Sequence, residues 1–445
     1  MLKLFNNNSW LSVRFSIILF SFFDFITLNI LFFNLYNIEN FINFATIFLY
    51  SSISIIFLYI FGRYTKNFTP TIREALDDIK IIFLSNIFSL ILIHIIISLI
   101  EIFDYKILTI YQFTLTSIIF FFIAIFTNIL FKNFSINYNF QDKYWITFLE
   151  SKSLNDLQKS KSFTSPRFKI RYDYENYLEL AKKNKIAGVI YDEKYLKINK
   201  YKNLIDICIK NKTRFLTIEK WNENIINFFS EEYIYNYIST NSLLLNQNLF
   251  AKIIKRVMDI VLSLILIVLT SPLIILTSII IFLEDKNSIF YFQQRNGLDN
   301  KSFKIIKFRS MKKDAEIGGP SWAYKNDPRV TKIGRIIRKY RIDELPQLIC
   351  VLKGEMSLIG PRPERGIIDN QLIKLIPKYN LRYKLKPGLT GWAQVNFSYG
   401  ASVDDSKIKL GFDLFYIRNF SILLDFFILL KTIKIVLKGN NSVPK

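Results

Sequence analysis

Two adjacent carboxylates, Asp343 and Glu344, are the residues of this sequence best placed to do chemistry. Cations precede them and Pro346 follows them, at a point where a helix would begin. A helix start attracts anions because its free amides and its dipole are positive, and the preceding cations could hold a multiply charged phosphate there. The plain alternative is a helix cap, in which both acids only satisfy free amides. The preceding cations are Arg338, Lys339 and Arg341.

Other side chains suited to catalysis are scarce. The single histidine, His94, lies in an apolar run, which argues against histidine acid–base or metal chemistry. Cys208 and Cys350 stand too far apart for a metal or redox motif, so we expect reduced, packed thiols. Carboxylates therefore remain the main candidates for catalysis.

Further segments could bring cations or polar groups to the two acids. Lys307 and Arg309 lie in an extended basic segment that suits phosphate contacts but is equally typical of a solvated sheet edge. Arg362 lies in a rigid turn between two prolines, and Gln394 lies in a turn-rich stretch. The loop Gly318–Trp322 contains glycine and proline and is a candidate lid.

The composition indicates a membrane protein with an acidic partner. Of the 445 residues, 51% are hydrophobic and 43 are phenylalanine, which is too apolar for a purely soluble protein. The formal net charge of +23 favours nucleic acid, anionic lipid or a phosphorylated substrate as the partner. Phosphates and lipid suit a membrane protein better, so the prediction is no nucleic acid.

Four apolar runs near the N-terminus are each about long enough to cross a bilayer. Cations precede the first run, separate the second from the third and follow the fourth, whereas the other two connections are poor in cations. The positive-inside rule then places the N-terminus and everything after Phe131 in the cytoplasm. Asp24 and His94 within the runs could form an ion path or bond between helices. The runs are Phe15–Asn34, Phe41–Phe61, Ile81–Ile100 and Phe113–Phe131.

Residues 140–250 have the pattern of a small α/β segment. Short strands alternate with amphipathic helical patterns, which predicts a small parallel sheet. No glycine-rich turn follows the first strand, which disfavours dinucleotide binding and favours a structural or dimerising role. The expected strands are Trp145–Leu149, Ile186–Ile190 and Arg214–Ile218, and the expected helices are Tyr174–Asn184 and Lys200–Asn211.

A fifth apolar run, Val257–Leu283, is interrupted by Ser271 and Pro272. Proline removes a backbone donor and clashes with the preceding turn, so we expect a sharp bend there, with the Ser271 hydroxyl serving a freed backbone group. Cations flank the run on both sides, which places both ends in the cytoplasm. The prediction is a re-entrant helix over residues 252–284, and a kinked full span is the alternative.

The C-terminal segment is expected to be a mixed domain with short turns. Its last apolar stretch, Phe412–Leu437, has the pattern of an amphipathic helix on the membrane, with packing into the core as the alternative. The other expected elements are extended segments over Ile289–Arg295 and Phe303–Met311, a helix over Ile333–Tyr340, and a helix from Asp343 to Gly354.

Together these motifs resemble those of the bacterial polyprenyl-phosphate hexose-1-phosphate transferases, the monotopic-type initiating phosphoglycosyl transferases of exopolysaccharide and O-antigen synthesis. The resemblance covers about Lys255–Leu437, and the arrangement fits the large members with four N-terminal transmembrane helices. Its motifs are Lys255–Asp259, Ser271-Pro272, Lys307–Met311, Asp343–Leu348, Lys353–Glu364 and Lys386–Gln394.

The resemblance implies a two-step exchange at the cytoplasmic face. Asp343 would attack the β-phosphorus of a UDP-sugar, release UMP and carry the phosphosugar covalently, and Glu344 would act as base on the polyprenyl phosphate that accepts it. Asp343 and the phosphates would bind Mg²⁺, the implied cofactor. Arg338 and Arg362 match positions that hold phosphate or nucleotide. The further candidate substrate-binding residues are Lys307, Arg309 and Gln394.

The predicted fold class is membrane α plus α/β. A four-helix transmembrane block over 1–138 precedes a small degenerate Rossmann-like cytoplasmic domain over 139–245, and an α/β catalytic domain over 246–445 is anchored by the re-entrant broken helix. The predicted protein is an undecaprenyl-phosphate sugar phosphotransferase of the bacterial inner membrane, with its catalytic domain in the cytoplasm and a homodimer compatible with the extra domains. Transfer without a covalent intermediate, and a non-catalytic scaffold or polymer-length regulator, remain alternatives, and the sugar stays open.

Overall fold

The computed structural model divides into two compact units, and each is described by itself. One unit comprises Met1–Leu149 with Pro166–Leu216, and the other Glu150–Ser165 with Thr217–Lys445. The helices expected over 174–184 and 200–211 and the loop 318–322 lie outside the described residues. The structure describes residues 15–36, 40–64, 72–101, 108–137, 144–148, 169–171, 186–191, 214–244, 249–312, 315, 327–397 and 402–438.

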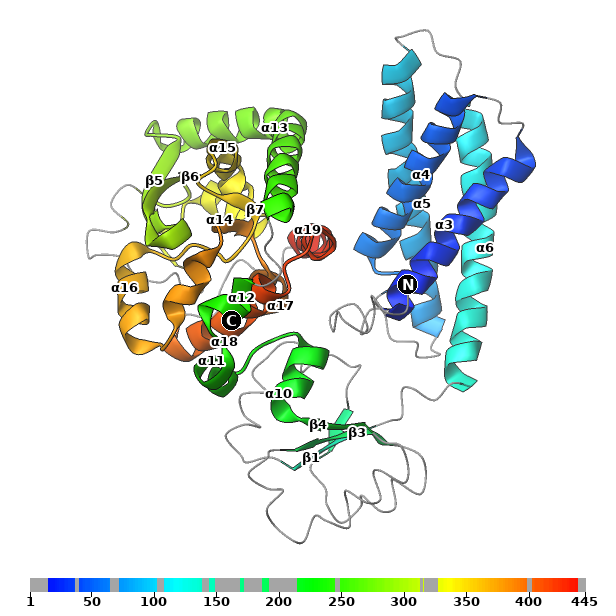
Figure 1. The fold of residues 1–445 in the computed structure, drawn as a ribbon. Coiled ribbons are helices and arrows are strands. Elements are labelled where there is room, and N and C mark those ends of the chain that lie inside the picture. Colours follow the sequence, from blue (N-terminus) through cyan, green and yellow to red (C-terminus); the bar gives the residue numbers. More distant parts are fainter. Residues whose placement is uncertain are drawn as a thin grey trace, which may run out of the picture. The chain divides into compact units, whose positions relative to one another are not determined.

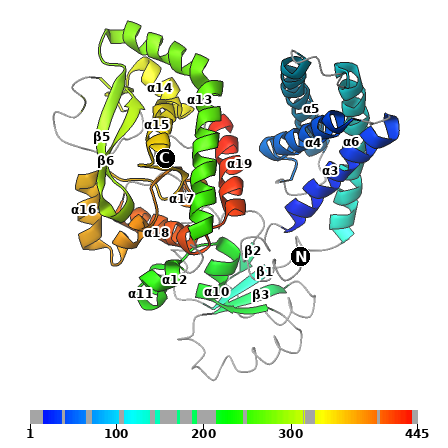
Figure 2. The same cartoon turned by 45° about the horizontal axis from the view of Figure 1, so that its top comes forward.

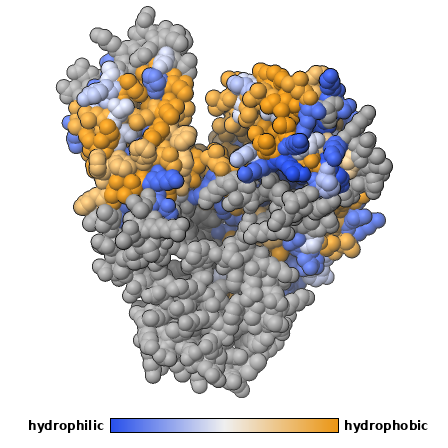
Figure 3. All heavy atoms as spheres, turned by 180° about the vertical axis from the view of Figure 1, so that it is seen from behind, coloured by the Kyte–Doolittle hydropathy of each residue, from blue (hydrophilic) through white to orange (hydrophobic). Residues whose placement is uncertain are grey.

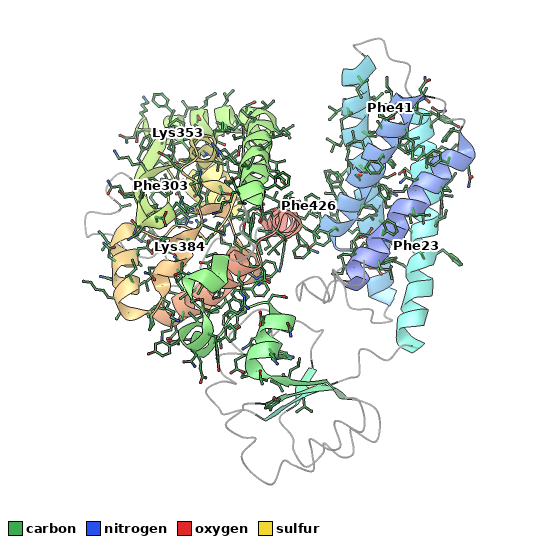
Figure 4. All side chains as sticks on the ribbon, in the orientation of Figure 1. Phe23, Phe41, Phe303, Lys353, Lys384 and Phe426 are labelled. Carbon is green, nitrogen blue, oxygen red and sulfur yellow. The ribbon has the colours of Figure 1, made fainter. Side chains whose placement is uncertain are left out.

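Four long apolar helices dominate the first unit (Figure 1). Each is long and apolar enough to cross a bilayer, as predicted for a membrane-type block. Their outward faces carry large apolar side chains, including Phe23, which is labelled in Figure 4. Such faces favour an apolar environment, because contact between large apolar side chains and water is unfavourable. The helices are α3 (Phe15–Leu35), α4 (Phe41–Phe61), α5 (Ile72–Glu101) and α6 (Ile110–Asn137).

A buried ion pair joins three parts of this helical block. Arg63, just after α4, donates to the Asp24 carboxylate of α3 through Nε at 2.7 Å, and also donates to the Ala124 carbonyl of α6. The Tyr64 hydroxyl donates to the same carboxylate at 2.8 Å. Asp24 therefore bonds between helices, whereas His94 lies on the exposed face of α5. For Asp24 these contacts favour bonding between helices over an ion path.

The first unit also contains a four-stranded sheet with strand order β2-β1-β3-β4. β1 pairs parallel to both β2 and β3, so Trp145 lies opposite Ile170 and Gly188. The three predicted strands occur within two residues of their expected bounds. β2 was not predicted, because three residues with two cations carry no strand pattern. The strands are β1 (Tyr144–Phe148), β2 (Lys169–Arg171), β3 (Ile186–Tyr191) and β4 (Arg214–Thr217).

The second unit combines short strands with helices around a buried core. The antiparallel hairpin of β5 (Phe290–Asn296) and β6 (Ser302–Phe308) agrees with the two predicted extended segments. α14 (Lys332–Lys339) also occurs as predicted. The acids Asp343 and Glu344 lie in the 3-10 turn η4 (Ile342–Gln347), and the α-helix that follows, α15, begins only at Leu348. The remaining elements are η3 (Leu298–Asn300), α15 (Leu348–Lys353), β7 (Ser357–Ile359), α16 (Gly366–Leu375), η5 (Tyr379–Lys384), β8 (Gly388–Thr390) and α17 (Trp392–Asn396).

The pairing of strands β7 and β8 holds the loops that adjoin them in fixed positions. Gly360 donates its amide to the Thr390 carbonyl, and Gly388 donates its amide to the Pro361 carbonyl, each at 2.9 Å. A Cβ on Gly360 would lie 2.4 Å from the Lys386 carbonyl oxygen, so only glycine permits this approach. The pairing holds the proline-flanked turn after β7 beside the turn-rich loop before α17.

The long helix α13 (Leu249–Asp285) carries Pro272 in its interior. Pro272 has no amide to offer the Val268 carbonyl one turn earlier, and the Ser271 hydroxyl donates to that carbonyl instead, at 2.8 Å. The expected hydrogen bond from the Ser271 hydroxyl to a freed carbonyl is therefore present, whereas the re-entrant course of the helix stays a prediction. Figures 1 and 2 both draw α13 as a helix that bends before it reaches β5. Hydrogen bonding therefore continues through the bend, and the helix is kinked rather than broken.

Both ends of α13 pack against the same unit. Near its start, Arg256 donates to the Val351 and Leu352 carbonyls, and Asp259 accepts a bond from the Leu358 amide. Near its end, Ile281 is buried against Phe308 and Ile337. A straight helix of 37 residues would be about 55 Å long. The bend is what lets both ends reach one compact domain.

The last apolar stretch forms two helices, which corrects the prediction of one. α18 (Val403–Arg418) and α19 (Ile422–Lys438) are separated at Asn419–Ser421. The last turns of α18 are buried, in line with the core-packing alternative, whereas α19 exposes apolar residues such as Phe426, which is 46% exposed (Figure 4). The sequence could not separate them because both halves are rich in the same apolar residues.

Residues 217–244 belong to the second unit and pack on α18. Trp392 donates its indole N–H to the Asn227 carbonyl, and Phe229 donates its amide to the Gly411 carbonyl of α18. Lys378 donates to three carbonyls at the end of α11. The segment contains α10 (Ile218–Trp221), the π-helical turn η2 (Asn222–Ile226), α11 (Glu231–Tyr237) and α12 (Thr240–Leu244).

Candidate active site

The turn η4 presents both acids because of one unusual backbone conformation. Arg341 adopts a left-handed conformation with φ 56°, which ends the path of α14 and starts η4. Its carbonyl then accepts a bond from the Glu344 amide at 3.2 Å. Such a conformation is unfavourable for a residue with a side chain and occurs often at functional sites. It places the Arg341 side chain next to the carboxylate of Glu344.

Three cations surround Glu344. Lys307 from β6 lies 3.3 Å from Oε1, and Arg341 lies 3.3 Å from Oε2. Arg362, from the turn after β7, donates to both carboxylate oxygens. The Glu344 side chain is only 9% exposed, so these charges interact in a partly desolvated place. β6, η4 and the turn after β7 meet at this one carboxylate.

Burial and neighbouring charge shift the pKa values in this cluster. Burial raises the pKa of Glu344, but Arg362, Lys307 and Arg341 outweigh it and hold the value well below the usual range. Burial lowers the pKa of Lys307 to about 8, although Glu344 opposes that shift. Glu344 is therefore the carboxylate stabilised in its ionised form.

Asp343 has a different environment although it is the next residue in the chain. It is 9% exposed and takes part in none of the three salt bridges at Glu344. Burial, followed by the charge of Glu344, raises the pKa of Asp343 to about 6. Arg338, on the last turn of α14, is among the cations that oppose this rise. The two carboxyls are thus driven apart in acidity, as expected for groups with distinct roles.

The turn that carries Arg362 is held by its carbonyl groups. Pro361 and Pro363 have no amide, so the turn can be fixed mainly through oxygen atoms. The Pro361 carbonyl accepts from Gly388, and the Arg362 carbonyl accepts from Arg382. The Pro363 carbonyl accepts from Nη1 of Arg295 at 3.0 Å. Three consecutive carbonyls are therefore each bonded, and the turn is rigid.

The structure brings most of the predicted site residues together. Lys307, Arg362 and Arg338 lie around the two acids, either in contact or as charges that shift their pKa values. Arg309 lies at the end of the hairpin, where its amide donates to the Ile289 carbonyl. Gln394 lies on α17, and its amide nitrogen donates to the Leu389 carbonyl. The roles of these residues toward a substrate stay predictions.

The sequence analysis did not identify the residues that fix the backbone of the Arg362 turn. Arg295 and Arg382 each fix a carbonyl of the Arg362 turn. Neither belongs to a motif with catalytic spacing, and a single arginine in a polar segment is normally a surface residue. Only the three-dimensional arrangement identifies them.

The two acids are compatible with one divalent cation. No group of three His, Cys, Asp or Glu residues that could hold a metal is found in the described part of the chain. Mg²⁺ commonly binds through one or two carboxylates plus substrate phosphates and water. Asp343 takes no part in the three salt bridges of Glu344, so its carboxylate suits this way of binding Mg²⁺. A substrate would have to supply the remaining oxygens.

The arrangement suits chemistry on a highly charged substrate. A carboxylate with a raised pKa is more basic, and a more basic carboxylate is a better nucleophile. The cations next to it can stabilise anionic oxygens, which provides most of the catalysis in phosphoryl transfer. Cys350 offers no competing chemistry, since its thiol is buried and burial raises its pKa.

Comparisons with known proteins agree on the nature of the second unit. The family model described as bacterial sugar transferase matches residues 250–439. The UDP-N-acetylgalactosamine-undecaprenyl-phosphate N-acetylgalactosaminephosphotransferase of Aeromonas hydrophila is 47% identical over 42% of this chain and 44% of its own length. The UDP-glucose:undecaprenyl-phosphate glucose-1-phosphate transferase of Escherichia coli K12 is 40% identical over 41% of this chain and 40% of its own length.

A third relative is matched along most of its length. The UDP-glucose:undecaprenyl-phosphate glucose-1-phosphate transferase of Caulobacter vibrioides is 39% identical over 42% of this chain and 71% of its own length. In the two relatives above, the match spans less than half of their length. The predicted resemblance is confirmed for the segment that contains Asp343 and Glu344.

Proposed function

The chain belongs to the bacterial sugar transferase family, and from this premise we propose that it transfers a sugar 1-phosphate from a UDP-sugar to undecaprenyl phosphate. UMP is the released product, and the lipid-linked phosphosugar would begin a surface polysaccharide. The observation that carries the proposal is the contrast between Asp343 and Glu344. Three cations hold Glu344, while Asp343 stays outside their salt bridges with a raised pKa.

In the first step, an oxygen of the Asp343 carboxylate attacks the β-phosphorus of the UDP-sugar. A new bond forms between that oxygen and phosphorus, the bond from phosphorus to the bridging oxygen breaks, and its electron pair leaves with UMP. Lys307, Arg341 and Arg362, which contact the adjacent Glu344, would stabilise the negative charge that develops on the phosphate oxygens. Splitting a transfer between two bulky substrates into two displacements lets one small site serve both.

In the second step, a phosphate oxygen of the lipid attacks the phosphorus held on Asp343. The bond between phosphorus and the Asp343 oxygen breaks, and the carboxylate is regenerated. Glu344 accepts the proton of the lipid phosphate and so increases its nucleophilicity. Phosphate oxygens compete with Glu344 for Arg362, Lys307 and Arg341, and this competition would release Glu344 for its role as base.

Mg²⁺, held by Asp343 and phosphate oxygens, would neutralise charge on the diphosphate when bound. The protein side of this arrangement is positioning. The left-handed Arg341 and the proline-flanked turn of Arg362 fix two cations before any substrate arrives. Preorganised charges avoid the cost of reorganisation during reaction.

The proposed location is the cytoplasmic face of the bacterial inner membrane, with α13 as a re-entrant helix. The bend at Pro272 and the packing of both helix ends on one unit support this topology. Figure 3 shows apolar side chains gathered on the C-terminal unit as well as on the helical block. The exposed apolar side chains of α13 include Val268, which is 71% exposed, and Leu283, which is 67% exposed. A bent helix with apolar outer faces suits one leaflet of a bilayer.

The topology is testable by labelling cysteines introduced at exposed positions. Lys252→Cys and Asn300→Cys lie on either side of the bend. We expect a membrane-impermeant maleimide to reach both from the cytoplasmic side in inverted vesicles. Labelling from opposite sides would establish a full span and overturn the re-entrant arrangement.

UDP-N-acetylgalactosamine is the donor we place first. The relative named for that sugar is 47% identical to this chain, compared with 40% and 39% for the two named for glucose. UMP release from UDP-N-acetylgalactosamine, UDP-galactose and UDP-glucose, measured in parallel with one purified preparation, ranks the donors directly. Turnover of UDP-glucose alone would contradict this assignment.

The covalent intermediate is testable by trapping. With a donor radiolabelled in the β-phosphate and no lipid acceptor, we expect label on the protein and one UMP released for each label. Asp343→Asn should abolish both, and Glu344→Gln should accept label but pass it slowly to lipid. Asp404→Asn, at an exposed position at the start of α18, is the matched control and should behave as wild type. An active Asp343→Asn variant would overturn the mechanism.

A further inference from the structure

Arg382 lies behind the candidate active site and is 5% exposed. Its Nη2 atom donates to the Arg362 carbonyl at 2.7 Å and to the Asp413 carboxylate at 2.9 Å. Its Nη1 atom donates to the Tyr379 hydroxyl at 2.6 Å. Buried arginine requires such partners, because an isolated buried cation is very unfavourable. The guanidinium is therefore held from two sides and directed at one carbonyl.

The element that holds Arg382 is part of the core. Asp413 lies on α18, is 2% exposed and forms a salt bridge with Arg382. Burial raises the pKa of Asp413 to about 6, and Arg382 is the main opposing influence. A second carboxylate, Asp369 of α16, approaches Nη1 to 3.9 Å. The position of the guanidinium is thus set by α16, η5 and α18 together.

The carbonyl that Arg382 bonds belongs to the residue whose side chain holds Glu344. Arg362 therefore has its backbone fixed by one arginine while its own guanidinium binds the carboxylate. Without Arg382 the Arg362 carbonyl would lose a charged donor at a turn whose two prolines offer no amide. A small shift of the turn would move the Arg362 side chain relative to Glu344 and to a bound phosphate.

We propose that Arg382 is a positioning residue for the transfer reaction, which orients Arg362 through its backbone carbonyl. The proposal rests on the proposed function, since it assigns a role in that same site. Arginine suits the role because its rigid fork serves the Arg362 carbonyl, Asp413 and Tyr379 at once. A lysine has one nitrogen and would reach only part of this set.

The test measures the rate constant for UMP release and covalent labelling by full-length protein in lipid nanodiscs. The amplitude of labelling counts the active molecules, so the rate constant is independent of how much protein is misfolded. We expect Arg382→Gln to lower the rate constant on the order of 10- to 100-fold, because displacing a substrate-binding group by about 1 Å has that effect. Arg382→Lys should lie between Arg382→Gln and wild type.

A double-mutant cycle separates positioning from a purely structural role. If Arg382 acts through Arg362, the double variant Arg362→Gln/Arg382→Gln should be no more than about twofold slower than Arg362→Gln. Arg418→Gln is the matched control, because Arg418, the last residue of α18, also donates to a tyrosine hydroxyl, that of Tyr233, at 3.0 Å. It should keep the wild-type rate constant.

Each contrary outcome has a distinct meaning. Multiplicative effects of the two substitutions, or a lower amplitude with an unchanged rate constant, would show that Arg382 supports only the fold and would overturn the positioning role. A wild-type preparation that neither takes label nor releases UMP from any UDP-sugar would overturn the proposed function, and with it this role.

Discussion

At the scale of single residues, the site depends on two neighbouring carboxyls that experience opposite electrostatic environments. Glu344 has three cationic partners, and its pKa is held well below the usual range. Asp343 is buried beside that charge, and its pKa is raised to about 6. Because a difference in pKa between folded and unfolded chains is a difference in stability, the two acids should respond oppositely to neutralisation.

Asp343→Asn is expected to stabilise the protein at pH 7 in buffer free of divalent cations. The folded-state pKa of Asp343 lies above the ordinary value of 3.8, so wild type loses stability as pH rises between about 4 and about 6. The substitution removes that loss, which is on the order of 3 kcal/mol for a pKa shift of this size. Thermal unfolding at pH 4 and pH 7 should show the gain only at pH 7, and an equal gain at both would contradict the raised pKa.

Glu344→Gln is expected to have the opposite effect. It leaves Arg362, Lys307 and Arg341 without their shared carboxylate, and removal of one partner from a buried charge cluster costs on the order of 3 kcal/mol. The depressed pKa means that this stability is present above about pH 4.5 and is lost as pH falls. The difference between Glu344→Gln and wild type in thermal unfolding should therefore shrink on acidification. A difference that stays constant would show that charge is not its cause.

The acids and some of their cations could be predicted at this scale, and the residues that orient them could not. Asp343, Glu344 and Arg362 stand in recognisable patterns of charge and proline. The left-handed backbone of Arg341 leaves no mark in the sequence, because glycine or asparagine would be the expected residue there. Arg382 acts from η5 through a backbone carbonyl, a contact that only tertiary folding creates.

At the scale of elements, α13 shows how a proline and a hydroxyl together produce a bend. Pro272 removes the amide that would bond the Val268 carbonyl, and Ser271 replaces that donor. Ser278 of the same helix also donates to a carbonyl, that of Ile274, but there the backbone amide remains available. The two serines therefore form a natural matched pair.

Ser271→Ala should destabilise the protein by about 1 kcal/mol, and Ser278→Ala should have little effect. Only the first leaves a carbonyl of an apolar helix without a donor, which costs a typical hydrogen bond or more. Unfolding of both variants in identical nanodiscs gives the comparison. Equal losses would show that the hydroxyl at the bend has no special role.

Helices and strands were predicted correctly where apolar periodicity, or residues typical of helix ends and turns, marked them in the sequence. The helices α3 and α4, the β5–β6 hairpin and α14 lie close to their expected bounds, because apolar runs and alternation mark them directly. The helices α5 and α6 extend beyond the predicted apolar runs, since α5 begins at Ile72 and α6 ends at Asn137. The break at Asn419–Ser421 was missed, since the apolar composition continues through it. Tertiary contacts fix the two helices at this break: the Tyr416 hydroxyl donates to the Asp425 carboxylate across it, and Lys255 of α13 forms a salt bridge with the same carboxylate.

At the scale of the whole molecule, the second unit extends beyond the segment that the family model matches. The match begins at residue 250, whereas the unit includes Thr217 onward. Contacts of the added segment are specific: the Trp392 indole bonds the Asn227 carbonyl, and a Cβ on Gly411 would lie 2.1 Å from the Phe229 carbonyl oxygen. Residues 217–244 therefore make specific, close-packed contacts with α17 and α18.

A chain beginning at Thr217 should keep the UMP-releasing activity and thermal stability of the second unit, and a chain beginning at Phe250 should not. The shorter chain leaves the buried Trp392 N–H without its acceptor, which alone costs about 1–3 kcal/mol, and frees the Lys378 ammonium from the end of α11. The longer chain keeps all of α13 and the shorter chain lacks only its first residue, Leu249, so membrane attachment is matched. Thermal unfolding and UMP release in nanodiscs measure the difference. Equal stability of the two chains would show that residues 217–249 only link the units, whereas a loss confined to the shorter chain would make them part of the catalytic fold.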